Sequence, residues 1–355
     1  MVGARPNFMK VAPLVAELER RADTFETVLV HTGQHYDDGM SAVFLQELGV
    51  PDPDFDLGVG SGSHAAQTAR VMEELEPVLV ETAPHAVFVA GDVNSTLGAA
   101  LTAVKLEIPV GHIEAGLRSF DRSMPEEINR VVTDAVSDML FVHSPEAVDN
   151  LLREGAEPEG VHLVGNTMID TLVAMRTRIE AAGTRERLGL RRGGYVVVTL
   201  HRPSLVDGPL LADAMAALGV VARELTVVFP VHPRTRAALS ARGISVHGGV
   251  ELLEPLGYLD FMSLVVDSAG VITDSGGIQE ETTFLGIPCF TLRANTERPV
   301  TCTVGTNTLL GLAPERIADV PQLLAETQTD GARIPELWDG AAAQRIVDVL
   351  ARRLG

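Results

Sequence analysis

Cysteine, lysine and aromatic residues are scarce in this sequence, and it contains no long hydrophobic run. The two cysteines, Cys289 and Cys302, are too few for a disulfide framework and wrongly spaced for a zinc cluster. No stretch approaches the roughly 18 uninterrupted apolar residues that a membrane-spanning helix needs. The first residues also lack the basic and then apolar order of a signal peptide. We therefore expect a cytoplasmic protein with no metal site and no membrane partner.

Positive charge is the next shortage. There are 28 Lys and Arg residues against 48 Asp and Glu, which gives a formal net charge of −20. Nucleic-acid-binding proteins normally present a basic face, so we expect no nucleic-acid partner. Lysine occurs only at Lys10 and Lys105, a bias that we attribute to a GC-rich or salt-tolerant source. An anionic substrate can still bind such a chain, but only where cations are concentrated locally.

The rest of the composition is that of a soluble globular protein, with 46% hydrophobic residues in 355. Because a domain typically has about 100–200 residues, we expect two domains. Short runs rich in Val and Ile alternate with helix-length patterns. The predicted strands are residues 27–31, 86–91, 110–114, 139–143, 161–164, 195–200, 227–231, 270–273 and 288–292.

Helical patterns separate these runs. The predicted helices are residues 63–81, 95–106, 125–137, 210–225, 257–268 and an amphipathic segment at 340–354. Most of the strands are apolar throughout rather than alternating, as strands buried on both faces are. The fold class that we predict is therefore α/β, with two doubly wound parallel-sheet domains.

We place the domain boundary after residue 167. Residues 1–167 then form the first domain, 168–337 the second, and 338–355 a C-terminal helix. The Arg- and Gly-rich residues 181–194 indicate a surface loop. The glycine-rich residues 58–63 follow no convincing strand, so a flexible loop is favoured over a dinucleotide-binding turn.

Polar residues recur where the predicted strands end. In open parallel sheets, ligands bind beyond the carboxyl ends of the strands, so these residues are the candidates for function. They are Gln34, His35, Asp92, Glu114, His201, His232 and the run Asp274, Ser275, Gly276 and Gly277.

The strongest local signal is residues 272–281, Ile-Thr-Asp-Ser-Gly-Gly-Ile-Gln-Glu-Glu. A strand ends, two glycines permit a tight approach, and a helix begins with free N–H groups that suit a diphosphate. Glu281, about one turn further on, could accept both hydroxyls of a ribose. The alternative is an ordinary strand-to-helix turn with Ser275 as its N-cap, and taken alone the two interpretations are about even.

Three carboxylates form the second signal. Asp92 and Glu114 close predicted strands, and Glu126 opens the helix that follows, so they could share one crevice and shift one another's pKa values. Glu126 could instead favour the helix dipole, and Asp92 could be an N-cap. Glu114 has the weakest structural alternative, because an acid that closes a buried strand needs a partner.

Histidines and arginines complete the candidates. His201 and His232 follow strands directly, with Arg202 and Arg234 beside them, and this favours an anionic ligand over a surface role. His31 and His112 lie inside strands and are expected in the core or in support of the site. Arginine is the preferred phosphate clamp, although a single arginine is more often a solvated surface charge. The remaining candidate cations are Arg5, Lys10, Arg293 and Arg298.

In order and spacing these motifs resemble the non-hydrolysing UDP-N-acetylglucosamine 2-epimerase family over nearly the whole chain. Each motif is modest alone, and the set is highly specific. The motifs are GARPNFMK at 3–10, HTGQHY at 31–36, GDVNST at 91–96, VGHIEAGLR at 110–118, PEEINR at 125–130, TLHRP at 199–203, PVHPR at 230–234, DSGGIQEE at 274–281 and TERP at 296–299.

The resemblance implies two Rossmann-like domains facing a cleft, similar to glycosyltransferase-B enzymes, and a homodimer. It implies an isomerase that interconverts UDP-N-acetylglucosamine and UDP-N-acetylmannosamine through 2-acetamidoglucal, without a cofactor. The C2 proton is not adjacent to a carbonyl and is poorly acidic, so departure of UDP must drive its loss. Such a site needs a cradle for the diphosphate and carboxylates on the sugar.

Roles also follow from the resemblance, motif by motif. Asp92, Glu114 and Glu126 would be acid/base groups, and His201 would assist the leaving oxygen. The substrate-binding residues would be Arg5, Lys10, Arg130, Phe261, Ser275, Gly276, Gly277, Glu281, Arg293 and Arg298. A regulatory site for a second substrate molecule would use Gln34, Arg70, Arg202 and His232.

Three features depart from the family pattern. Only Met1 and Val2 precede the first motif, where the family has a buried strand, so we expect the true start to lie upstream. Asp37 replaces a frequent glutamine of the regulatory site, and residues 203–205 replace acidic and amide residues. The alternatives are a hydrolysing epimerase, an epimerase for a modified UDP-sugar, a glycosyltransferase, or a nucleotide-sugar-binding protein without catalysis.

Overall fold

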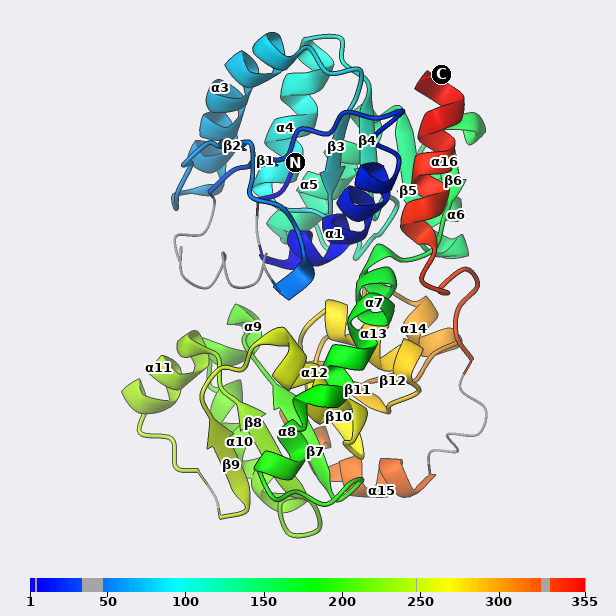
Figure 1. Cartoon of the computed structure of the whole chain (residues 1–355). Helices are drawn as coiled ribbons and strands as arrows, with labels where there is room; N and C mark the ends of the chain where they lie inside the picture. The colour runs from blue at the N-terminus through cyan, green and yellow to red at the C-terminus, as the bar shows by residue number, and fades with distance from the viewer. Residues whose placement is uncertain (4, 34–46, 247, 327–332, 355) are drawn as a thin grey trace. The chain divides into compact units, whose positions relative to one another are not determined.

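The chain divides into two compact units, which are described separately. The computed structural model describes residues 1–3, 5–33, 47–246, 248–326 and 333–354. Unit 1 comprises Met1–Ala174 and Glu336–Gly355, and unit 2 comprises Met175–Pro335 (Figure 1). The division falls inside helix α7 (Thr167–Ala182), several residues after the position expected from the sequence. The first half of α7 belongs to unit 1 because Thr171 Oγ1 donates to the Met9 carbonyl at 2.6 Å.

Unit 1 is built on a parallel sheet of four strands in the order β3-β4-β5-β6. These strands are β3 (Val87–Ala90), β4 (Val110–Ile113), β5 (Met139–Val142) and β6 (Val161–Leu163). The helices between and beside them are α1 (Arg5–Arg20), α3 (His64–Thr82), α4 (Asn94–Lys105), α5 (Pro125–Val136), α6 (Pro145–Arg153) and the 3-10 turn Pro158–Gly160. Strands β4 and β5 are buried along their whole length, as the unbroken apolar runs predict.

A second, two-stranded parallel sheet in unit 1 pairs β1 (Val30–His31) with β2 (Phe55–Asp56). Val2 lies alongside it: its N–H donates to the Val30 carbonyl at 2.9 Å, and it forms an isolated parallel bridge with His31. The Met1 ammonium group is buried and donates to the Phe88 carbonyl of β3 at 2.9 Å. These two residues therefore lie in extended backbone between the two sheets.

Unit 2 contains one parallel sheet of six strands in the order β12-β11-β10-β7-β8-β9. The strands are β7 (Tyr195–Thr199), β8 (Thr226–Pro230), β9 (Val250–Leu253), β10 (Gly270–Thr273), β11 (Cys289–Thr291) and β12 (Asn307–Leu309). The helices are α8 (Thr184–Arg187), α9 (Pro203–Val206), α10 (Leu210–Val221), α11 (Pro233–Ala241), α12 (Tyr258–Val266), α13 (Gly277–Leu285), α14 (Val300–Thr303), α15 (Val320–Glu326) and the 3-10 turn Pro314–Asp319. The chain builds outward from β7 on one side and from β10 on the other, so the strand order reverses between these two neighbours. This switch point is where open parallel sheets bind ligands.

The final helix, α16 (Ala342–Leu354), returns to unit 1 and packs against α1. Its apolar face is buried, including Ile346, Val347 and Leu350. The segment that leads into it is fixed by Trp338, whose ring is 1% exposed and whose Nε1 donates to the His143 carbonyl at 2.8 Å. The amphipathic pattern of residues 340–354 therefore predicted both the helix and its buried face.

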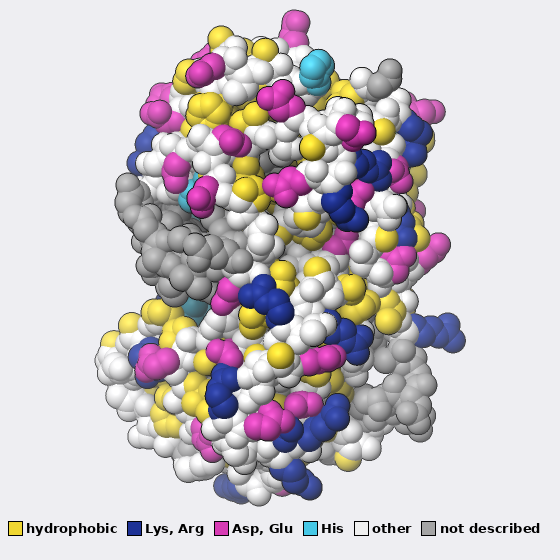
Figure 2. All heavy atoms as spheres, in the orientation of Figure 1, with side chains coloured by type: hydrophobic (Ala, Val, Ile, Leu, Met, Phe, Trp, Pro, Cys, Tyr) yellow, Lys and Arg dark blue, Asp and Glu magenta, His cyan; other side chains and the backbone are white. Residues whose placement is uncertain are grey.

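The predicted fold class is confirmed, and every predicted strand is present with its ends within three residues of the predicted ones. The sequence did not predict β2, β9 and β12, because these strands are not apolar and buried throughout; β9 and β12 are the edge strands of their sheet. The loop expected over residues 181–194 is partly wrong, since it contains the one-turn helix α8. Within the residues that the structure describes, no helix is both long and apolar enough to cross a bilayer. Acidic side chains are spread over the visible faces of both units, with basic side chains between them (Figure 2).

Candidate active site

The two candidate acids of unit 1 follow neighbouring strands at the same edge of its sheet. Ala90 of β3 pairs in register with Ile113 of β4, so Asp92 and Glu114 come immediately after the ends of these strands. Ile113 in turn pairs with Phe141 of β5, two residues before His143. The carboxyl ends of β3, β4 and β5 therefore present two acids and an imidazole to one edge, as the strand-end argument predicts.

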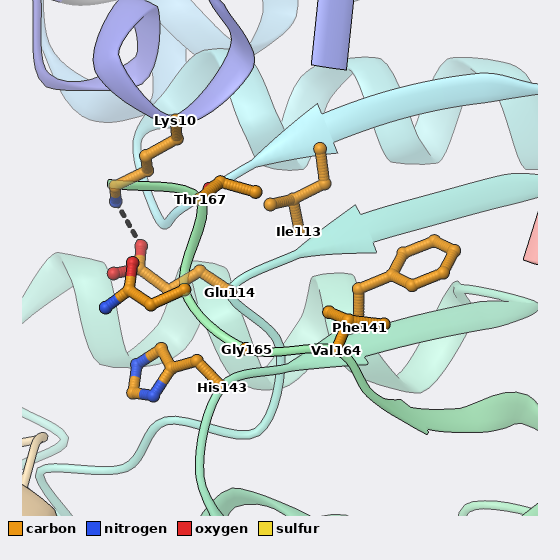
Figure 3. A pocket seen from close by; sticks show the side chains of 9 residues that line it. Lys10, Ile113, Glu114, Phe141, His143, Val164, Gly165 and Thr167 are labelled. Carbon is orange, nitrogen blue, oxygen red and sulfur yellow. Dashed lines mark hydrogen bonds and ion pairs between the residues drawn. The ribbon is translucent and has the colours of Figure 1, made fainter. Parts of the chain in front are cut away.

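Glu114 has an unusual backbone conformation and a paired carboxylate. Its φ of 70° lies in the left-handed region, which a side-chain-bearing residue rarely adopts, and such strain is concentrated at functional sites. Its carboxylate forms an ion pair with Lys10 of α1, and these side chains are 7% and 8% exposed (Figure 3). An acid at the end of a buried strand needs a polar or charged partner, and the partner of Glu114 is Lys10.

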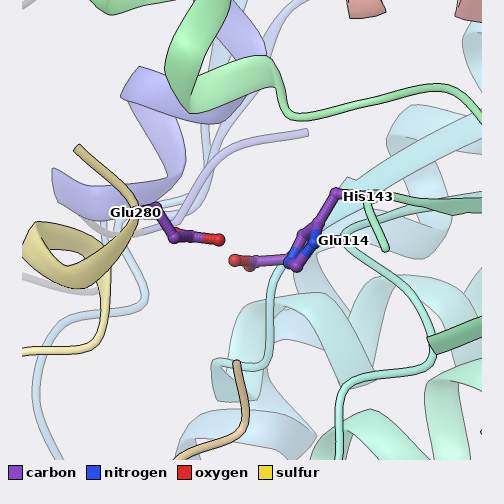
Figure 4. A group of neighbouring side chains, drawn as sticks. All are labelled: Glu114, His143 and Glu280. Atoms are coloured by element: carbon purple, nitrogen blue, oxygen red, sulfur yellow. The ribbon is translucent and has the colours of Figure 1, made fainter. Parts of the chain in front are cut away.

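A small hollow lies beside this ion pair. Lys10, Glu114, His143, Asn166 and Thr167 are among the residues that line it (Figure 3). Its volume of about 10 Å³ leaves room for roughly one water molecule. The ring nitrogen of His143 and the carboxylate of Glu114 lie within 4.8 Å of each other (Figure 4). The hollow is therefore lined by a cation, an anion, an imidazole and an amide.

Asp92 is held by a different cation. Its carboxylate forms an ion pair with Arg130 of α5 and remains 26% exposed. It does not cap α4, because the N-cap position is Val93 and no side chain caps that helix. The preceding Gly91 has a φ of 65°, and a Cβ there would lie 2.7 Å from Lys10 Nζ. The turn before Asp92 thus lies directly against the Lys10–Glu114 pair.

The adjacent acids at the start of α5 have different surroundings. Glu127 is buried and accepts hydrogen bonds from the Ser119 N–H at 2.9 Å, the Ser119 hydroxyl at 2.8 Å and the Phe120 N–H at 2.9 Å. It also pairs with Arg130 at 2.7 Å, so its role is to hold the loop and the clamp on Asp92. Glu126 is partly exposed and bonds to no polar group among the described residues. This difference favours Glu126 as the reactive acid.

In unit 2, the turn between β10 and α13 has the geometry of an anion site. Its N-cap position is Gly276, without a side-chain cap, so the alternative in which Ser275 caps the helix is wrong. The Ser275 N–H bonds instead to Thr273 Oγ1 at 2.9 Å. A Cβ on Gly276 would lie 2.8 Å from a terminal nitrogen of Arg298, so any side chain there would have to displace the Arg298 guanidinium. A helix start with an arginine at its mouth suits a diphosphate.

His201 lies across the switch point from this turn. Its Nδ1 is 3.0 Å from Asp274 Oδ1, while Asp274 Oδ2 accepts the backbone N–H groups of His201 and Arg202 at 2.8 and 2.7 Å. One buried carboxylate therefore fixes both the turn after β7 and the His201 ring. The ring of His232 lies 5.7 Å from that of His201, and burial, followed by the charge of His201, lowers the pKa of His232.

A cluster of arginines surrounds the same turn of unit 2. Arg293 is buried and forms a two-bond ion pair with Glu297 at 2.7 and 2.6 Å, which commits its guanidinium within the chain. Arg298 contacts Glu280 at 3.1 Å within unit 2. Burial, followed by the charge of Arg293, lowers the pKa of Arg202. Excess positive charge of this kind would be relieved by an anionic ligand.

Glu281 is buried one turn into α13 and accepts the Tyr258 hydroxyl at 2.9 Å. Burial raises the pKa of Glu281 to about 7, although the Tyr258 hydrogen bond opposes this shift. Phe261, partly buried, lies one turn after Tyr258 on α12. The Tyr258 hydrogen bond therefore links the start of α12, one turn before Phe261, to Glu281 on α13.

The residues expected to form a regulatory site are only partly described. Gln34 and Asp37, and the Arg5 side chain of the substrate set, lie outside the described residues. Arg70 donates to the carbonyls of Val59 at 2.8 Å and Ser61 at 3.0 Å, so it holds the glycine-rich loop in this structure.

Sequence reasoning missed several buried residues that support these groups. Asp134 of α5 bonds to His112 and Arg118, Tyr258 bonds to Glu281, and Asp274 was noted only as a strand-end residue. A signal was available for Asp134: charged residues at 127, 130 and 134 recur with helical spacing, and all three are buried. His112 is buried and bonds to Asp134 at 2.6 Å, whereas His31 is only partly buried and bonds to the exposed Asp56 at 3.0 Å.

Comparison with known proteins decides the family. A family model described as UDP-N-acetylglucosamine 2-epimerase matches residues 16–351 of this chain. The chain belongs to the UDP-N-acetylglucosamine 2-epimerase family. It is 41% identical over 363 residues to the UDP-N-acetylglucosamine 2-epimerase of Methanococcus maripaludis, a match that covers 99% of this chain and 97% of that one.

Two further members of this family bear on the substrate and the fold. The chain is 40% identical over 358 residues to the UDP-2,3-diacetamido-2,3-dideoxy-D-glucuronate 2-epimerase of Pseudomonas aeruginosa, covering 99% of this chain and 98% of that one. The crystal structure of the Methanocaldococcus jannaschii UDP-GlcNAc 2-epimerase, in complex with UDP-GlcNAc and UDP, matches with a TM-score of 0.89 at 36% identity, covering 99% of this chain and 98% of that one. The predicted family and its glycosyltransferase-B-like α/β fold class are therefore confirmed.

Proposed function

We propose that the protein interconverts UDP-N-acetylglucosamine and UDP-N-acetylmannosamine by eliminating UDP and adding it back at C1 while a proton is delivered to the opposite face of C2. Membership of the epimerase family carries this proposal. The geometry supports it: two carboxylates, Asp92 and Glu114, lie at adjacent strand ends, and each is held by its own cation. In unit 2, a glycine-lined helix start lies beside Arg298.

The elimination needs both kinds of group. A carboxylate takes the C2 proton, the C2–H electron pair forms the C1–C2 double bond of 2-acetamidoglucal, and UDP leaves with the C1–O pair. Because the C2 proton is poorly acidic, stabilisation of the departing diphosphate must lower the barrier. Re-addition of UDP and delivery of a proton to the opposite face of C2 complete the epimerisation, and a second acid suits that step.

We assign the roles accordingly. Asp92, Glu114 and Glu126 exchange protons with the sugar, and His201, oriented by Asp274, assists the leaving oxygen. The backbone of residues 275–277 and Arg298 hold the diphosphate, Glu281 the ribose and Phe261 the uracil. Lys10 is also assigned to substrate binding, and its ion pair with Glu114 places its ammonium group beside that carboxylate. The further substrate-binding assignments are Arg5, Arg130 and Arg293, and those of a regulatory site are Gln34, Arg70, Arg202 and His232.

Incubation of the purified protein with UDP-N-acetylglucosamine tests this function. We expect nuclear magnetic resonance and chromatography to show a mixture of the two UDP-sugars with only traces of free UDP. Stoichiometric release of UDP would support a hydrolysing epimerase instead. Tight UDP binding without turnover would support a binding protein, and transfer of the sugar to an acceptor would support a glycosyltransferase.

A modified UDP-sugar is the second candidate substrate, because the Pseudomonas aeruginosa relative is nearly as similar as the first one named. The discriminating measurement is kcat/KM for UDP-N-acetylglucosamine against that for UDP-2,3-diacetamido-2,3-dideoxy-D-glucuronate. The main proposal expects a preference for the former. A preference for the latter would keep the reaction and change the substrate.

The homodimer and the cytoplasmic location belong to the same proposal. Homodimerisation is inferred from family resemblance, and light scattering that gives the mass of one 37.8 kDa chain would overturn it. The location follows from the intracellular supply of UDP-sugars, and fractionation of cells tests it.

A further inference from the structure

Asp134, near the end of α5, lies at the centre of a buried hydrogen-bond network. This network reaches the turns that carry Asp92 and Glu114. Its side chain is 2% exposed. Its Oδ1 bonds to His112 Nδ1 at 2.6 Å, and its Oδ2 accepts the Gly116 N–H at 3.1 Å and an Arg118 N–H at 2.7 Å. Three groups from residues 112–118 thus meet at one carboxylate of α5.

One branch of this network reaches the turn that carries Asp92. His112, with no exposed surface, contacts the Gly91 carbonyl through its Nε2 at 2.9 Å. The carbonyls on either side are held as well: that of Ala90 accepts from Asn7 at 2.9 Å, and that of Asp92 accepts from Asn129 at 2.9 Å. Three successive peptide carbonyls are thereby fixed by side chains, which sets the direction of the Asp92 side chain.

The other branch reaches the turn that carries Glu114. Gly116, two residues later, has a φ of 77° and gives its N–H to Asp134. A Cβ at Gly116 would lie 2.4 Å from the Ala147 carbonyl oxygen, so the backbone here passes close to α6. Arg118 joins Asp134 to Glu154 through its Nε at 2.9 Å. The left-handed conformation of Glu114 is therefore followed directly by an anchored turn.

We propose that Asp134 is a positioning residue for the reaction: through Gly116 and through His112, this one carboxylate fixes the backbone that aims both Glu114 and Asp92 at the sugar. The inference rests on the proposed function, in which these two acids exchange protons with the substrate. An error of about 1 Å in such an aim costs roughly 10²-fold in rate.

The network is built to hold its geometry. Burial alone would raise the pKa of Asp134, but the charge and hydrogen bond of His112, and then those of Arg118, outweigh it and keep the pKa below its usual range. The charged carboxylate can accept all three of its partners, because an ionised acid is an acceptor at both oxygens. An asparagine at position 134 could keep some of the hydrogen bonds that Asp134 accepts. An alanine would accept none of them and would release the turns that carry Asp92 and Glu114.

The test compares Asp134→Ala with Asp134→Asn on UDP-N-acetylglucosamine and on its 2-deuterio form. We expect Asp134→Ala to lower kcat about 10²-fold and to raise the deuterium isotope effect on kcat. KM and the Kd for UDP should stay within about threefold, since the nucleotide residues belong to unit 2. Asp134→Asn should recover most of kcat. His112→Leu, which frees only the Gly91 carbonyl, should give a smaller fall than Asp134→Ala and covers the case in which the latter does not fold.

Asp138→Ala is the matched control. Asp138 accepts the Val110 N–H at 2.9 Å, so it holds the start of β4. Glu114 follows the opposite end of that strand. Its removal should leave kcat and the isotope effect at wild-type values. Folded Asp134→Ala and His112→Leu proteins with wild-type kcat and isotope effect would overturn the positioning role of Asp134 and leave the proposed function standing. A folded wild-type protein without turnover would overturn the proposed function, and this inference with it.

Discussion

At the scale of single residues, three charged side chains of the site are each held by a partner of opposite charge. Glu114 has Lys10, Asp92 has Arg130, and Arg293 has Glu297. Removing one partner from such a pair leaves an uncompensated charge, so these pairs hold geometry as much as they add stability. The candidate acids that keep some exposure are Asp92 and Glu126, as groups that must reach a substrate require.

Neutral variants of the two strand-end acids should separate chemistry from binding. We expect Asp92→Asn and Glu114→Gln each to slow turnover about 10²–10⁴-fold, the usual contribution of a proton-transferring group. The Kd for UDP, measured by calorimetry, should change little. Asp138→Ala provides a contrast, because Asp138 bonds to the end of β4 away from both acids and its removal should act on stability. Near-wild-type rates in the first two variants would give Asp92 and Glu114 structural roles only.

Glu281 should make nucleotide binding depend on pH. Because burial raises its pKa to about 7, the carboxylate is mostly protonated at pH 6 and mostly charged at pH 8. Ribose hydroxyls donate to the charged form, so the affinity for UDP should rise by about tenfold over this range. In the Glu281→Gln variant, the UDP phosphates still titrate, but the tenfold rise in UDP affinity caused by Glu281 should be absent. Parallel pH profiles for the two proteins would remove Glu281 from the ribose site.

At the scale of elements, apolar runs and the helical period predicted the central strands and several of the helices. Features without such a sequence pattern were missed. Unbroken apolar runs such as residues 195–199 identified central strands, and the 3.6-residue pattern identified α16. The sequence left open whether Ser275 caps α13, because the cap position cannot be assigned until the backbone is known, and the structure has Gly276 there. The links from Asp134 to Gly116 and from Asp274 to His201 join residues far apart in sequence, and spacing does not encode such distances.

The start of α16 offers an element-scale prediction. Asp170 accepts the N–H groups of Ala342 at 3.1 Å and Ala343 at 2.7 Å, and burial raises its pKa from 3.8 to about 6. The folded state then holds this proton more tightly than the unfolded state, so the stability contribution of Asp170 is present below about pH 4 and is lost as pH rises through 6. The shift of about 2 units corresponds to at most about 3 kcal/mol.

Asp170→Asn should remove that slope. Trp338 is the single tryptophan and lies buried beside α16, so its fluorescence during urea unfolding reports on unit 1. The free energy of unfolding of wild type minus that of Asp170→Asn should fall between pH 4 and pH 7. A constant difference across this range would contradict a raised pKa for Asp170.

At the scale of the whole molecule, the net charge of −20 should oppose folding at low salt. Self-repulsion among acidic groups destabilises the compact state, and salt screens it within about 10 Å at 0.1 M. We expect Tm to rise by about 2–4 °C between 20 mM and 500 mM NaCl, which corresponds to about 1 kcal/mol. The double variant Glu73→Lys and Glu76→Lys, at exposed positions of α3, should show a smaller rise. A Tm that is flat or falls with salt would contradict this account.

The central claim is that the protein removes and returns the proton at C2 of a UDP-sugar while UDP departs. The most direct measurement is proton nuclear magnetic resonance of UDP-N-acetylglucosamine incubated with the protein in D2O. We predict that the C2 proton signal disappears from both UDP-sugars as UDP-N-acetylmannosamine accumulates, and that Asp92→Asn and Glu114→Gln slow this exchange. A folded wild-type protein that leaves the C2 proton in place would contradict the account.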